Sequence, residues 1–129
     1  MDDWREIGIR VVGLARKLVT TPSVVDSDGE AEVAGVLEAY LREHSAGLDH
    51  VQINSVAVDK PTACRAVLAH ARPRIETKRT LLLLGHTDTV GLEPYGPLAP
   101  VAYDSAALKE HFAASDNDGR YHLAKTALP

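Results

Sequence analysis

The stretch of residues 80–90, TLLLLGHTDTV, holds the side chains best suited to chemistry in this sequence. His86 and Asp88 stand two positions apart, directly after four leucines and a glycine. Zinc accepts a neutral imidazole nitrogen, and a carboxylate or carbonyl on the other ring nitrogen usually orients such a ligand. The spacing therefore suits a metal ligand with its orienting carboxylate. On its own H-x-D is a weak signal, and the plain alternative is a solvated loop at the end of a strand.

The leucine run predicts the element that would position these two side chains. An uninterrupted apolar run that stops at a glycine is typical of a central strand in an α/β sheet, which is covered on both faces. Ligands in such sheets bind at the carboxyl ends of the strands. We therefore expect residues 81–84 to form a central, mostly buried strand, with His86 and Asp88 on the loop just past its end.

Two amphipathic helices are expected before that strand. The first spans about residues 3–19 and ends before Pro22, and its apolar stripe must be buried against something. The second begins at the S-x-x-E pattern of Ser27 and Glu30, which has the spacing of a capping box, and runs to about His44, with Gly47 closing it. The expected stripe of the first helix consists of Trp4, Ile7, Val11, Leu14, Ala15 and Leu18.

Alternating residues predict two strands, 51–58 and 63–71, joined as an antiparallel hairpin. In the first strand Val51 and Ile53 should face inward, with Val56 and Val58 following after a local irregularity. The prolines after Val90 disfavour regular structure, and a short helix should start at Asp104 or Ser105 and reach about residue 112 or 113. The expected fold class is α/β, a mixed sheet with flanking helices.

Composition narrows the functional classes. With 129 residues, 45% of them hydrophobic and 25% charged, the chain fits one soluble domain. A net charge of −4 without a basic stripe argues against nucleic acid or an anionic membrane as partner. The acidic start lacks the features of a signal peptide, and no apolar run is long enough to span a membrane, so a cytoplasmic location is expected. The single Cys64 fits a reducing compartment and is expected to be a small buried strand residue, not a nucleophile.

Other candidate residues carry weaker signals. His44 and His70 are better explained as packed or surface histidines than as ligands. Asp116, Asp118 and Gly119 superficially suggest a calcium loop, but the third carboxylate and the distal glutamate of that motif are missing. Neither the nucleophile elbow, the H-E-x-x-H pair nor a glycine-rich phosphate loop occurs in the sequence.

LLLLGHTDTVG resembles the first metal-binding signature of the dinuclear-zinc exopeptidase and deacylase family, which includes aminoacylase, acetylornithine deacetylase and succinyl-diaminopimelate desuccinylase. LVTTPSV with DSDGE resembles the serine-containing loop before that family's second helix, and EPYGPLAPVAYDSAALKEHF looks like the arginine-utilisation branch. The resemblance covers roughly residues 4–112. It implies a mixed-sheet catalytic domain with two zinc ions, His86 as a ligand of one zinc, and Asp88 as a catalytic residue that orients the site without binding metal directly.

The remaining ligands and the general base of the family lie downstream of the part that is matched, and the chain stops at Pro129. We therefore expect residues 1–129 to be an N-terminal fragment of a metallohydrolase catalytic domain, with an irregular tail over 113–129. The implied activity is zinc-dependent hydrolysis of amide bonds in small acylated amino acids or peptides.

The alternative is a truncated, catalytically inert fragment or a non-enzymatic interaction domain. A catalytic zinc normally takes three protein ligands, so this chain should bind zinc weakly or not at all. Apolar sheet surface left uncovered should also promote self-association.

Overall fold

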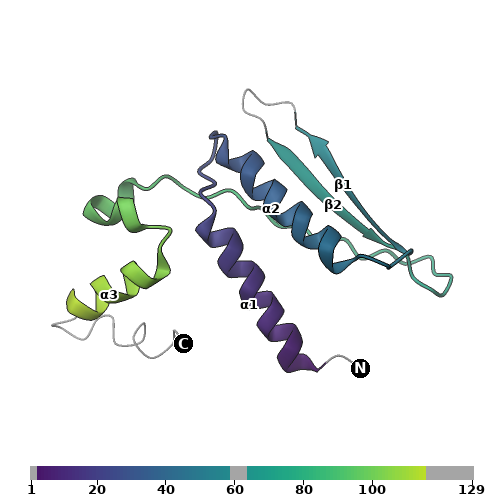
Figure 1. Cartoon of the computed structure of the whole chain (residues 1–129). Coiled ribbons are helices and arrows are strands. Elements are labelled where there is room, and N and C mark those ends of the chain that lie inside the picture. The colour runs from purple at the N-terminus through teal and green to yellow at the C-terminus, as the bar shows by residue number, and fades with distance from the viewer. Residues whose placement is uncertain (1–2, 59–63, 116–129) are drawn as a thin grey trace. The chain divides into compact units, whose positions relative to one another are not determined.

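The computed structural model describes residues 3–58 and 64–115, which form a small α/β structure (Figure 1). The chain divides into two compact units, Met1–Val90 and Gly91–Pro129. The turn expected between the two strands and the tail from residue 116 onward lie outside the described residues. The elements, in order, are α1 (Trp4–Thr20), α2 (Gly29–His44), β1 (Val51–Ala57), β2 (Arg65–Ala71), the 3-10 segment η1 (Glu93–Val101) and α3 (Ser105–Ser115).

The first predicted helix is confirmed as α1. The Asp3 side chain accepts a hydrogen bond from the Arg5 amide at 3.0 Å and so satisfies one of the free N–H groups of the first turn. The hydroxyl of Thr21 donates to the Lys17 carbonyl at 2.9 Å at the other end, and Pro22 follows. Local capping therefore sets both helix ends.

The burial expected for the apolar stripe of α1 is wrong for much of its length. Trp4 is 84% exposed and Val11 60% exposed, whereas Ile7, Leu14 and Leu18 are half-buried. Helix α1 contacts α2 along one side. The half-buried residues occupy one edge of the apolar arc, and the rest of the arc has no cover from the described residues.

Helix α2 is confirmed, but its capping box does not form as predicted. The Ser27 hydroxyl donates to the Val24 carbonyl at 2.5 Å, and the Glu30 carboxylate accepts from the Asp26 amide at 3.2 Å. Both side chains thus organise the connection before the helix, not its first turn. After the helix, Gly47 adopts a positive φ of 80°, as expected for the residue that closes it.

The hairpin is confirmed, with β1 and β2 antiparallel and Ile53 opposite Ala69. Ile53 is buried, Val51 and Ser55 are half-buried, and Val56 is 50% exposed. The period of two continues through Ser55, so the inward facing predicted for Val56 and Val58 is wrong. Helix α2 contacts both strands (Figure 1). Its Val33 and Ala34 are buried, as is Ile53 of β1, and these three residues are the small core of the described part of the chain.

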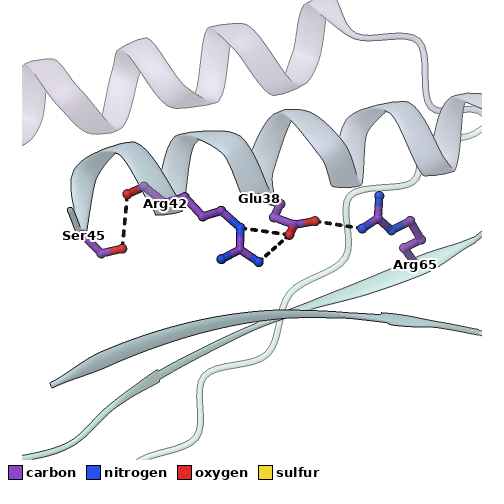
Figure 2. A network of polar contacts seen from close by, with 4 residues as sticks. All are labelled: Glu38, Arg42, Ser45 and Arg65. Atoms are coloured by element: carbon purple, nitrogen blue, oxygen red, sulfur yellow. Dashed lines mark hydrogen bonds and ion pairs between the residues drawn. The ribbon is translucent and has the colours of Figure 1, made fainter. Parts of the chain in front are cut away.

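An ionic network joins α2 to the hairpin (Figure 2). The Glu38 carboxylate, 16% exposed, accepts from Arg42 at 2.7 Å and from Arg65 of β2 at 2.9 Å. The hydrogen bond from Arg42, together with the charges of Arg42 and Arg65, holds the pKa of the Glu38 carboxyl below its usual value.

The predicted central strand is wrong. Residues 81–84 adopt no regular secondary structure, and Leu81, Leu82, Leu83 and Leu84 are between 73% and 88% exposed. The sheet of the described residues has two strands and is antiparallel throughout, in place of the expected mixed sheet. An apolar run forms a central strand only when neighbouring strands and covering layers bury it. The described part of the chain supplies neither for these leucines.

In the second unit, the proline-rich segment forms 3-10 turns where an irregular loop was expected. Segment η1 is interrupted at Gly96, whose dihedral angles of 52° and −121° are not helical. Helix α3 follows, and the Asp104 carboxylate accepts from the amides of Ala106 and Ala107 at 2.9 and 3.0 Å. This confirms Asp104 as the predicted cap, and the helix reaches Ser115.

Candidate functional site

His86 and Asp88 lie next to each other, as their spacing suggested. The Nδ1 atom of His86 is 3.2 Å from the backbone oxygen of Asp88 and 3.3 Å from its carboxylate Oδ1. Both oxygens are acceptors, so in a neutral ring the arrangement favours the proton on Nδ1 and leaves the lone pair on Nε2. The side chain of His86 is 83% exposed, so this nitrogen is accessible to a ligand.

The loop that carries these residues is tied to the connection between α1 and α2. The Thr89 amide donates to the Ser23 carbonyl at 2.8 Å, and the Val25 amide donates to the Thr89 carbonyl at 3.0 Å. Together these bonds make a short parallel bridge between Val24 and Thr89. The Ser23 hydroxyl adds a third bond, to the Thr87 carbonyl at 2.8 Å. Residues on both sides of Asp88 are therefore held.

The α1–α2 connection is itself closely packed. A Cβ atom at Gly29 would overlap the Pro22 carbonyl oxygen and lie 2.9 Å from its carbon, so only glycine allows this approach. Asp26 adopts a φ of 61°, a left-handed conformation that Asp tolerates better than most residues. Its amide donates to Glu30, which is 7% exposed. The conformation of the connection that holds the His86 loop is thus determined by residues close together in the sequence.

One buried hydroxyl beside the loop has no hydrogen-bond partner within the described part of the chain. The Oγ1 atom of Thr89 is enclosed, although the backbone of the same residue bonds to Ser23 and Val25. An unpaired buried hydroxyl costs free energy. Two neighbouring hydroxyl groups therefore differ: that of Ser23 donates a hydrogen bond, and that of Thr89 has no partner among the described residues.

The other predicted candidates do not join this site. His44 stacks on Tyr40 with ring centroids 3.9 Å apart, and His70 is an exposed residue of β2. Cys64, expected in a buried strand, directly precedes β2 and is half-buried, with its sulfur 3.9 Å from a Glu30 carboxylate oxygen. Within residues 3–58 and 64–115, no three His, Cys, Asp or Glu side chains gather in a way that could hold a metal ion. The calcium-loop residues from 116 onward are outside the described range.

Ser23 is the functional candidate that reasoning from the sequence missed. Its neighbours Thr21 and Pro22 marked the end of a helix, and nothing in the periodicity linked Ser23 to a loop 64 positions away. The available signal is the serine-containing segment LVTTPSV, whose resemblance to a family loop assigns no role to Ser23.

Comparison with known proteins gives one distant relative. The chain is 29% identical over 112 residues to Protein RocB of Bacillus subtilis strain 168, an alignment that covers 84% of this chain and 20% of the relative. The chain thus spans about a fifth of the length of that relative. No protein-family profile matches the sequence, and no solved structure matches it. None of the described helices combines the length and apolar character needed to cross a membrane.

Proposed function

We propose that this chain carries the first metal-ligand motif of a zinc-dependent hydrolase that cleaves amide bonds, of the peptidase or deacylase type. The observation that carries the proposal is the pairing of His86 Nδ1 with two oxygens of Asp88 at 3.2 and 3.3 Å. Metal-ligating histidines are usually held in this way by a carboxylate or carbonyl on the nitrogen that does not bind metal. The partial similarity to Protein RocB supports the proposal, since it extends over most of the chain.

In this proposal each residue has a separate role. His86 offers Nε2 to one zinc ion, and Asp88 holds the ring orientation and the tautomer without binding metal. Zinc in a complete site of this kind lowers the pKa of a bound water and polarises a carbonyl group. The substrate class proposed is a small acylated amino acid or a peptide.

The same observations favour a second candidate for the isolated chain, namely a catalytically inert piece or an interaction domain. A catalytic zinc usually takes three protein ligands, and the described residues bring together no such group. His86 alone would hold the ion weakly. Many large apolar side chains are also exposed, including Trp4 and the four leucines from Leu81 to Leu84, and exposed apolar side chains favour association.

Two measurements on the purified chain test these proposals. Zinc titration followed by the imidazole resonances should perturb His86 first, with a Kd weaker than about 1 μM because the ligand set is incomplete. His86→Ala should remove this response, and His70→Ala, which changes an exposed histidine on β2, should preserve it. A response that survives His86→Ala would show that His86 is not the ligand.

Activity is measured with a panel of acylated amino acids and dipeptides, with and without added zinc or cobalt. We expect no turnover, since positioning a water and its base requires groups that the described residues do not assemble. Metal-dependent turnover that disappears in His86→Ala would contradict inertness and would show that the chain, alone or as an oligomer, completes a working site.

A further inference from the structure

The hydroxyl group of Ser23 is the only side chain atom in the described bonds between the α1–α2 connection and the His86 loop. Ser23 is fully buried, with 0% of its surface exposed. We propose that Ser23 is a positioning residue for His86, which keeps the ring in the tautomer that leaves Nε2 free. The use of Nε2 for zinc rests on the proposed function, whereas the control of the tautomer does not.

The three bonds restrain different parts of the His86 loop. The two backbone bonds, from Thr89 to Ser23 and from Val25 to Thr89, fix the residue that follows Asp88. The hydroxyl bond instead fixes the carbonyl of Thr87, the residue between His86 and Asp88. The bond from the Thr89 amide also holds the peptide unit that carries the Asp88 carbonyl. Among the described bonds, only the hydroxyl bond restrains the peptide unit between Thr87 and Asp88, whose rotation would move the Asp88 side chain relative to the histidine ring.

The position of that peptide unit decides where the proton of His86 lies. With the Thr87 carbonyl held, two oxygens of Asp88, its backbone carbonyl oxygen and its Oδ1, lie within 3.3 Å of His86 Nδ1. When the peptide unit between Thr87 and Asp88 can rotate, the Asp88 carboxylate is no longer kept at that distance, although the Thr89 amide still holds the unit that carries the Asp88 carbonyl. An exposed histidine in water then divides its proton between the two nitrogens, and the fraction with a free Nε2 lone pair falls.

The test measures the tautomer directly. Nitrogen-15 resonances of the imidazole ring report which nitrogen carries the proton, in the whole chain and at about pH 8, where imidazole is ordinarily neutral. Wild type should show His86 mainly protonated on Nδ1. Ser23→Ala should shift both ring resonances toward the averaged values of an unrestrained histidine, while His70 in the same sample stays unchanged.

Thr89→Val is the matched control, because it removes a buried hydroxyl from the same region that has no partner in the described structure. It keeps the backbone bonds to Ser23 and Val25, so His86 should retain the wild-type resonances. A general loosening of the loop caused by any lost hydroxyl would instead change His86 in both variants, and that result would overturn the specific role of Ser23.

Ser23→Cys keeps the test decisive if Ser23→Ala fails to fold. Cysteine has the same shape as serine with a larger atom at the end, but its thiol is a weak donor, so we expect a tautomer shift in the same direction as that of alanine. Wild-type resonances of His86 in a folded Ser23→Cys chain would overturn the proposal. Zinc titration of the same samples separates the two ideas: a tautomer shift in a chain whose His86 ignores zinc supports the Ser23 role and counts against the use of His86 Nε2 for zinc by this chain.

Discussion

Gly29 and Gly35 lie in the same helix, α2, yet replacing each by alanine should have opposite effects on stability. A Cβ at Gly29 would overlap the Pro22 carbonyl and lie 2.9 Å from its carbon, whereas a Cβ at Gly35 meets nothing within 4 Å. The contact at Gly29 is with backbone, which cannot rotate away as a side chain could. Overpacking of this kind typically costs about 1–3 kcal/mol.

Helix propensity works in the other direction. Alanine is favoured over glycine by up to about 1 kcal/mol inside a helix, and less is expected at Gly29, which is the first residue of α2. We therefore expect Gly29→Ala to destabilise the first unit by about 1–2 kcal/mol, and Gly35→Ala to stabilise it by about 0.5–1 kcal/mol.

Urea denaturation followed by circular dichroism checks this prediction through the two midpoints. The reasoning fails if Gly29→Ala is as stable as the wild type, because the close approach to Pro22 would then impose no cost. It also fails if both variants lose the same amount, since that would indicate a general intolerance of α2 to added methyl groups. Gly29→Ala should in addition disturb the His86 resonances, because the same connection holds that loop.

Two further predictions follow from the ionic network and from the leucines. Glu38 has a lowered pKa in the folded state. Its ion pairs with Arg42 and Arg65 therefore stabilise the protein fully at pH values above the pKa of the unfolded state, near 4.5, and this stabilisation is lost as the pH falls through the pKa of the folded state. Glu38→Gln should therefore lower the unfolding midpoint at neutral pH and flatten its acid dependence, while the control Glu43→Gln should leave both unchanged. Leu82→Lys should reduce self-association in sedimentation measurements without lowering the unfolding midpoint, because Leu82 is 73% exposed; a large loss of stability would indicate that this leucine is buried.

Local signals in the sequence predicted the helices and the hairpin well. The ends of α1 depend on Asp3 and Pro22, the start of α3 depends on Asp104, and the strands follow from their period of two. Each of these features is decided by residues a few positions apart. A sequence pattern can therefore specify them without knowledge of the tertiary structure.

The failures share a different cause. Burial of Trp4, Val11 and the four leucines requires partner surfaces that no local pattern can guarantee, and the described residues do not provide them. The same distinction between local and long-range features applies to the candidate site. The spacing of His86 and Asp88 revealed their pairing, but the role of Ser23 depends on a bond across 64 positions and left no periodic trace.

The bond between Ser23 and Thr87 also determines when the candidate site can form during folding. Closing a fully flexible loop of 64 residues would cost about 3.7 kcal/mol of chain entropy beyond a constant term, by the logarithmic dependence on loop length, and α2 and the hairpin within the loop lower this cost once they form. Helices and a hairpin, whose contacts are local, form in microseconds without meeting that cost. The His86 loop should therefore be placed last as the chain folds and released first as it is heated. A substitution that loosens the connection between α1 and α2 would then release His86 and Asp88 before the helices themselves unfold.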